Sequence, residues 1–146
     1  MLAIETVHHV SLPASDLGRS SEFYEGVLGL EPIERPPFGF AGRWYEVGDR
    51  SLHLIVPEAG DDATFRHGKA IDSRDAHFAI RVRSYTAAVA HLESKGFRPS
   101  SDRNPRRTPD NLQPMRLNPS GPAGFPQIYV LDPDDNVIEL NAATQQ

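Results

Sequence analysis

The chain contains no cysteine among its 146 residues. This absence excludes disulfide bonds and thiolate chemistry, so any metal ion must be bound through nitrogen and oxygen atoms. No apolar run is long enough to cross a bilayer, and the opening residues MLAIETVHHV lack the charged-then-apolar order of a signal peptide. We therefore expect a cytoplasmic protein that has no contact with a membrane.

Basic residues are also few, with 15 lysines and arginines against 20 aspartates and glutamates and a formal net charge of −5. A nucleic-acid partner would favour a basic surface, so we expect none. Hydrophobic residues make up 38% of the chain and charged residues 24%, as in ordinary globular proteins, and the length suits one domain with its own core.

Four segments alternate in the manner of strands, and each carries one side chain of metal-ligand type opposite its large apolar residues. In SLHLIV, for example, Leu52 and Leu54 oppose His53. The four candidate ligands are His9, His53, His77 and Glu139. Three imidazoles and a carboxylate that converge from four strands would form a metal site.

The order of the predicted elements repeats along the chain. In each half, a strand that contains a histidine (His9 or His77) precedes a helix that a glycine ends. Each half then closes on a hairpin, RWYEVGDRSLHL or QIYVLDPDDNVIEL, and matching the two hairpins aligns His53 with Glu139. The four candidates are therefore two positions, each used twice. The expected modules cover about 5–57 and about 75–142, with a linker at about 58–74, in a single domain over 1–146.

The segments HHVSLPASDLGRSSEFYEGVLGLE and LDPDDNVIEL resemble the opening and closing motifs of the vicinal oxygen chelate superfamily, which includes glyoxalases, bleomycin resistance proteins and extradiol dioxygenases. The resemblance covers roughly residues 5–142. It implies an α+β fold of two βαβββ modules that form a cupped mixed sheet around a metal. It also implies a homodimer whose sites are shared between chains. The implied cofactor is a divalent metal ion (Zn²⁺, Ni²⁺, Co²⁺, Mn²⁺ or Fe²⁺) bound by His9, His53, His77 and Glu139.

The resemblance favours a glyoxalase-like lyase or isomerase that acts on a small substrate with adjacent oxygens. It implies a metal-bound enediolate and Glu139 as the catalytic base. Glyoxalase I-like proteins usually have glutamate where this sequence has His53. If His53 does not bind the metal, the remaining two histidines and one carboxylate suit an extradiol-type Fe(II) dioxygenase. A non-catalytic binding or resistance protein is the third interpretation, and four intact ligand positions argue against it.

Two further segments supply candidate substrate-binding residues. The Pro- and Gly-rich segment over 34–42 contains Phe38 and precedes Trp44, and together these rings would form an apolar wall or pack a dimer contact. The segment over 99–122 is rich in proline, asparagine and arginine and is expected to be irregular, as in a lid or binding loop. Its Arg107 and Arg116 would bind a substrate carboxylate or phosphate, and the alternative interpretation is a solvated basic loop.

Overall fold

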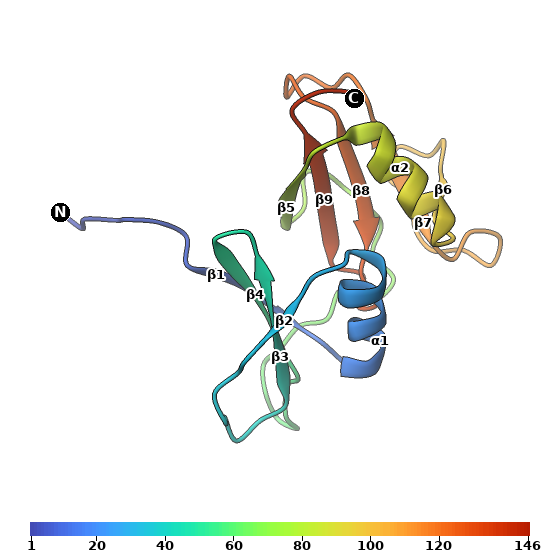
Figure 1. The fold of residues 1–146 in the computed structure, drawn as a ribbon. Coiled ribbons are helices and arrows are strands. Elements are labelled where there is room, and N and C mark those ends of the chain that lie inside the picture. Colours follow the sequence, from blue (N-terminus) through green and yellow to red (C-terminus); the bar gives the residue numbers. More distant parts are fainter. The chain divides into compact units, whose positions relative to one another are not determined.

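Alternating apolar residues build two mixed β-sheets in this computed structural model, which describes residues 1–146. The chain divides into two units, Met1–Phe65 and Arg66–Gln146. Each unit contains one sheet and one helical segment, which confirms the predicted α+β class (Figure 1). None of the helices combines the length and the apolar character that a membrane span requires.

The first unit has a four-stranded sheet in the order β1-β4-β3-β2, in which only β1 and β4 are parallel. Its elements are β1 His9–Pro13, α1 Leu17–Ser21, the π-helical η1 Glu22–Val27, β2 Pro32–Ile33, β3 Gly42–Val47 and β4 Arg50–Ile55. The helical segment begins after Asp16, whose carboxylate accepts a hydrogen bond from the backbone N–H of Arg19 at 2.9 Å. It ends before Gly29, which has a φ of 71°.

The helical segment of the first unit packs against one face of its sheet. Tyr24 of η1 stacks on Tyr45 of β3 with ring centroids 5.7 Å apart, and Tyr45 lies opposite Leu52 in the β3–β4 register. All three side chains are buried, and burying a large apolar side chain stabilises a fold by about 1.5–3 kcal/mol. Because strand side chains alternate, His9 and His53 belong to the other face of this sheet.

The second unit has a five-stranded sheet in the order β5-β9-β8-β7-β6, with β5 parallel to β9 and β6 parallel to β7. Its elements are β5 His77–Val82, α2 Tyr85–Ser94, β6 Arg98–Pro99, β7 Pro114–Asn118, β8 Gln127–Leu131 and β9 Val137–Ala142. The Ser84 hydroxyl caps α2 by accepting a hydrogen bond from the backbone N–H of Ala87 at 3.1 Å. Gly96, with a φ of 93°, follows its end.

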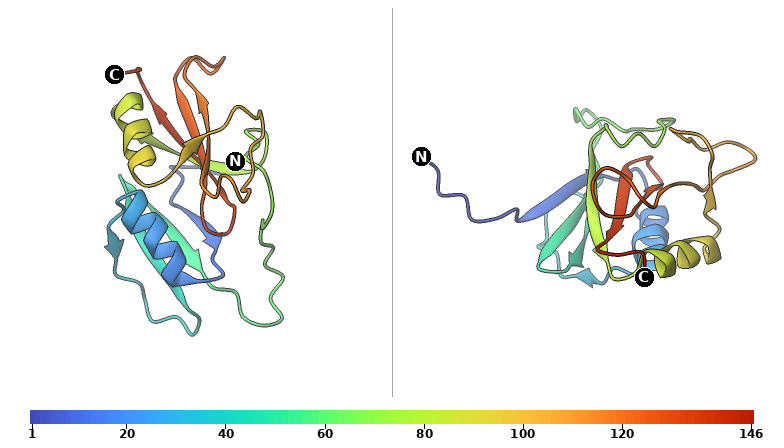
Figure 2. Two further views of the ribbon diagram at one scale, coloured as in Figure 1. Left: turned by 90° about the vertical axis from the view of Figure 1, so that its right-hand side faces the viewer. Right: turned by 90° about the horizontal axis from the view of Figure 1, so that it is seen from above.

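Helix α2 lies alongside β8 and β9 (Figure 2). The buried residues Ile128 and Leu140 pair in register on the apolar face of these strands. Tyr129 and Glu139 pair on the opposite face, where a small cluster of buried apolar side chains also lies. In each unit, therefore, the two candidate ligands lie on the sheet face opposite the apolar one.

The segment over 99–122 is more regular than its composition predicts. It contains β7, which pairs antiparallel with β8, so Arg116 lies on a strand rather than in a loop. The prediction of an irregular segment was wrong there because PMRLN is a short strand whose alternation is obscured by flanking proline and asparagine residues.

Candidate metal centre

The two units place their candidate ligands at equivalent positions. In the first unit, His9 of β1 is in register with the residue two positions before His53 in β4. In the second unit, His77 of β5 is in register with the residue two positions before Glu139 in β9. Residues two positions apart on a strand share a face, so each sheet brings one pair together. Within each unit, no group of three or more His, Asp or Glu side chains is arranged to hold a metal ion.

The pair in the second unit meets through its ligand atoms. Nε2 of His77 lies 3.2 Å from Oε2 of Glu139. Nδ1 of His77 lies 2.7 Å from the backbone carbonyl oxygen of Asp75, which can only accept, so Nδ1 carries a proton and Nε2 is the ring atom that can bind a metal. Two atoms bound at right angles to one metal at about 2.1 Å are about 3 Å apart. The observed spacing fits two adjacent ligands of one ion.

Glu139 is only 5% exposed, yet its surroundings favour the carboxylate. Its Oε1 accepts hydrogen bonds from the side-chain amides of Asn141 at 2.8 Å and Gln127 at 3.1 Å. Burial alone would raise the pKa of Glu139, but these bonds, one from Tyr129 and the charge of His77 together lower it. Burial, and then the adjacent carboxylate, raises the pKa of Tyr129 to about 12. The site therefore holds an ionised carboxylate beside a protonated phenol at neutral pH.

The pair in the first unit belongs to a stack of rings. His53 lies between His9, at a centroid distance of 4.1 Å, and Trp44, at 3.8 Å, with interplanar angles of 14° and 4°. Nε2 of His53 lies 2.9 Å from the hydroxyl of Ser51. Burial, followed by repulsion from neighbouring basic side chains, lowers the pKa of His53. The ring is therefore neutral at neutral pH, which is the form that binds metal ions.

The hydrogen-bond donors around the two equivalent positions explain why one is imidazole and the other carboxylate. The places that Gln127 and Asn141 take in the second sheet belong to Gly42 and Ile55 in the first. Neither has a side-chain donor, so a carboxylate at position 53 would be buried without these two bonds. The neutral ring of His53 has no such requirement.

Of the predicted substrate-binding residues, Trp44 and Arg116 lie on the faces that carry the ligand pairs. Trp44 is in register with His53, and Phe38 lies next to it at a centroid distance of 5.9 Å. Arg116 is in register with Tyr129, and its guanidinium lies 5.8 Å from the ring centroid. A cation in this position extends the row of polar side chains that contains Glu139.

Arg107 has a different environment, because all five of its N–H groups have acceptors within the second unit. Nε donates to the carboxylate of Asp135 at 2.8 Å. The other four donate to the Leu112 carbonyl, the Gln113 side-chain oxygen and the carbonyls of Leu131 and Asp132. This guanidinium holds the turn between β8 and β9 and has no N–H group left for a ligand.

Three polar side chains around Glu139 were missed from the sequence, namely Gln127, Tyr129 and Asn141. A signal was available, since Asn141 and Glu139 are two positions apart on one strand and Tyr129 aligns with Trp44 when the hairpins are matched.

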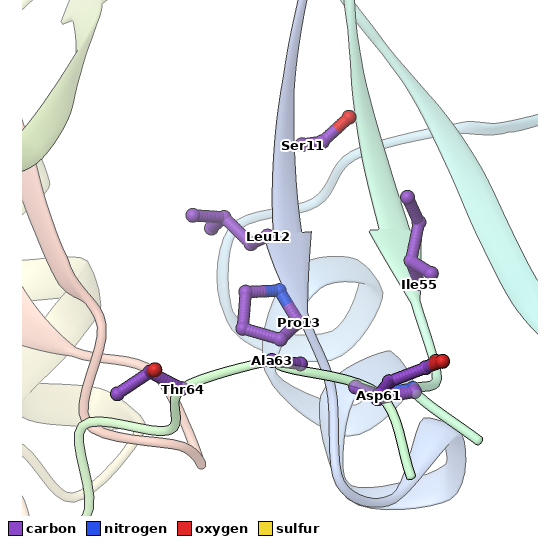
Figure 3. A pocket seen from close by; sticks show the side chains of 8 residues that line it. Ser11, Leu12, Pro13, Ile55, Asp61, Ala63 and Thr64 are labelled. Atoms are coloured by element: carbon purple, nitrogen blue, oxygen red, sulfur yellow. The ribbon is translucent and has the colours of Figure 1, made fainter. Parts of the chain in front are cut away.

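A pocket of about 340 Å³ lies at the ends of β1 and β4 in the first unit (Figure 3). Two of its lining residues are Ser11, which is in register with His53, and Ile55. The lining is completed by Leu12, Pro13, Pro57, Asp61, Ala63 and Thr64. The lining is largely apolar.

Both the sequence and the fold have matches among known proteins. The family model for the Glyoxalase/Bleomycin resistance protein/Dioxygenase superfamily matches residues 6–140. The Arabidopsis thaliana protein Glyoxylase I 4 is 26% identical over 140 residues, or 95% of this chain and 71% of that protein. Mitochondrial methylmalonyl-CoA epimerase of Mus musculus is 29% identical over 102 residues, or 66% of this chain and 56% of the epimerase. The crystal structure of lactoylglutathione lyase from Agrobacterium tumefaciens shares the fold, with a TM-score of 0.64 and 19% identity over 97% of this chain and 96% of that one.

Proposed function

The chain belongs to the glyoxalase/bleomycin resistance protein/dioxygenase superfamily, and on that basis we propose that it is a metal-dependent lyase or isomerase. The proposed substrate is a small molecule with two adjacent oxygens. The names of two relatives, Glyoxylase I 4 and methylmalonyl-CoA epimerase, support this class of reaction. The observation that carries the proposal is the pair of ligand atoms on His77 and Glu139 that face each other at 3.2 Å.

The proposed metal ligands are His9, His53, His77 and Glu139. The lowered pKa values of His53 and Glu139 favour neutral imidazole and carboxylate, the forms that bind a divalent cation. This nitrogen and oxygen donor set suits Zn²⁺, Ni²⁺, Co²⁺, Mn²⁺ or Fe²⁺. A bound ion would supply Lewis-acid stabilisation for negative charge on the two substrate oxygens. Sharing of these sites between the chains of a homodimer is part of the proposal.

Glu139 is the proposed catalytic base, and Oε2 is the atom that would take the proton if the carboxylate loosens from the metal when substrate binds. Two amide donors occupy Oε1, whereas Oε2 lies 3.2 Å from Nε2 of His77. A proton removed from the carbon next to a substrate carbonyl would therefore move to Oε2. Arg116, on the same face, is the proposed group that binds a carboxylate or phosphate of the substrate.

Metal analysis tests the proposal most directly. Protein purified without added metal and then soaked in divalent cations should bind about one ion per chain, and His77→Ala should abolish binding. His91→Ala is the matched control, because His91 is exposed on α2 and outside both pairs. A content that stays below about a tenth of an ion per chain after soaking would refute the proposal. Conversion of a methylglyoxal–thiol adduct without oxygen uptake would support the lyase.

A second candidate, an Fe(II) dioxygenase of the extradiol type, is favoured by the ring stack. His53 is stacked between His9 and Trp44, and its Nε2 lies 2.9 Å from the Ser51 hydroxyl, so these contacts suit a ring that lines the site. Without His53, the ligands are two histidines and one carboxylate, the set that leaves positions for a catechol and oxygen. Under this candidate, His53→Ala retains the metal and catechols cause oxygen uptake. Under the first, His53→Ala weakens metal binding.

A further inference from the structure

The stack around His53 continues outward along the first unit as an unbroken series of rings. Trp44 stacks on His53, Phe38 lies 5.9 Å from Trp44, and Phe40 lies 5.4 Å from Phe38 at an interplanar angle of 18°. The series begins at His9, which stacks on the far side of His53 at 4.1 Å. One end of the series is therefore the proposed metal-binding pair, and the other end is the segment between β2 and β3.

A guanidinium completes the outer end of this series. Arg35 lies over the rings of both Phe38 and Phe40, at 4.8 and 4.9 Å from their centroids. Its Nη2 donates to the Phe40 carbonyl at 2.9 Å, which fixes its orientation. A Cβ at Gly42 would lie 3.0 Å from Nε, so the glycine leaves the room in which this side chain lies. Arg35 forms no salt bridge, although Arg43 of the same unit pairs with Glu25.

The two outer rings of the series, Phe38 and Phe40, are exposed rather than buried in the core. Phe38 is 46% and Phe40 is 36% exposed, whereas the aromatic side chains that pack the helix on this sheet, such as Tyr24 and Tyr45, are fully buried. An ordered set of exposed rings with an uncompensated cation offers stacking surface and positive charge together. A planar ring that carries an anion is the ligand that matches both properties.

We propose that Arg35, Phe38, Phe40 and Trp44 form a recognition surface for a planar aromatic ligand that bears an anionic group. The aromatic ring of the ligand stacks on Phe38 and Trp44, and its anion pairs with Arg35. This inference rests on the proposed function, because the surface leads to His53, and it adds the chemical class of the substrate.

Trp44 is the sole tryptophan of the chain, so its fluorescence reports binding at this surface. The probes are 4-hydroxybenzoate, its neutral methyl ester, and cyclohexanecarboxylate, which is anionic but not planar. Each probe is titrated into protein treated with a chelator. Binding of cyclohexanecarboxylate is measured by its competition with 4-hydroxybenzoate. We expect 4-hydroxybenzoate to bind tightest. Phe38→Leu should weaken it about three- to tenfold, and Arg35→Met should remove its preference over the ester.

The matched controls are Arg81→Met and Phe125→Leu, which disrupt a similar cation–π contact of 5.0 Å in the second unit and should leave binding unchanged. Equal binding of cyclohexanecarboxylate, or unchanged binding by both Phe38→Leu and Arg35→Met, overturns the inference. So does a change in oligomeric state in Phe38→Leu with no change in ligand affinity, because the surface would then contact a second copy. Metal content is measured separately on Phe38→Leu, so failure of aromatic binding and failure of metal binding are distinguished.

Discussion

The amide bonds to Glu139 predict a pH-dependent stability that a single substitution should reduce. Asn141 donates to Oε1 at 2.8 Å inside a buried site. Asn141→Leu keeps a side chain of similar size and removes this donor. The folded-state pKa of Glu139 lies below its ordinary value of 4.5, because hydrogen bonds and the charge of His77 outweigh burial. The substitution should therefore raise this pKa.

The size of the effect follows from the charge on the acceptor. A hydrogen bond to an ionised group contributes about 1.5–3 kcal/mol. Because this bond is stronger to the carboxylate than to the neutral acid, its loss should raise the pKa of Glu139. A carboxyl group whose folded pKa is lowered stabilises the fold above its unfolded pKa and loses this contribution as pH falls through the folded pKa. Asn141→Leu should thus be less stable by about 1.5–3 kcal/mol near pH 7, and the deficit should shrink as the pH falls through the lowered pKa of Glu139.

Urea unfolding of chelator-treated protein near pH 7 and near pH 3 measures this deficit. Asn111→Leu is the control, because its amide donates to the uncharged carbonyl of Arg98 and any deficit should be the same at both pH values. In a Glu139→Gln background, the deficit of Asn141→Leu should also lose its pH dependence. A deficit in the wild-type background that is equal at both pH values to within about 0.5 kcal/mol would refute the reasoning.

Three further predictions concern packing and charge. Gly42→Ala should lower the free energy of unfolding by about 1–3 kcal/mol, because the added Cβ would lie 2.6 Å from a carbonyl oxygen of β4. Gly26→Ala is the control, because an added Cβ there has nothing within 4 Å and should not lower the stability. Equal urea midpoints for the two variants would contradict this prediction. Arg107→Met should lower the free energy of unfolding by about 3–5 kcal/mol, because it leaves the buried carboxylate of Asp135 without its ion-pair partner. The control Arg106→Met, at an exposed position, should lower it by less than about 0.5 kcal/mol. Equal thermal midpoints for the two variants would argue against a structural role of Arg107. Tyr129, one of four tyrosines, should ionise only near pH 12 in an ultraviolet absorbance titration; ionisation with the ordinary pKa of 10.0 would be contrary evidence.

Most of the fold could be predicted because its signals are local. A cap followed by a glycine defines both helical segments, at Asp16 and Gly29 and at Ser84 and Gly96. The turn at Gly48 defines the first hairpin, where the backbone has a φ of 61°. Strand β7 could not be predicted in the same way, because its five residues obtain their order from pairing with β8, a contact that local sequence does not encode.

Side-chain alternation along the strands was sufficient to predict which candidate ligands share a sheet face. Parity places His9 and His53 on one face, and His77 and Glu139 on another, because period two is a property of the strand alone. The hydrogen bonds to Glu139 depend on which residues of β8 lie opposite β9, and this register is set by tertiary structure. The same limit applies to the arginines. Arg107 and Arg116 belong to one basic segment, yet one holds a turn and the other lies on the face that carries Glu139.

Position 53 carries an imidazole and position 139 a carboxylate, although the two sheets have the same register. The two positions are therefore suited to different roles in the proposed reaction. At position 139, amide donors stabilise negative charge, so this unit can keep a carboxylate that accepts a proton. At position 53, stacked rings and apolar neighbours exclude such a charge and leave a neutral imidazole with an aromatic surface beside it. Proton transfer in the proposed reaction is therefore confined to Glu139. The equivalent position in the first unit is suited to contact the ligand, and this physical reason holds whether or not His53 binds the metal.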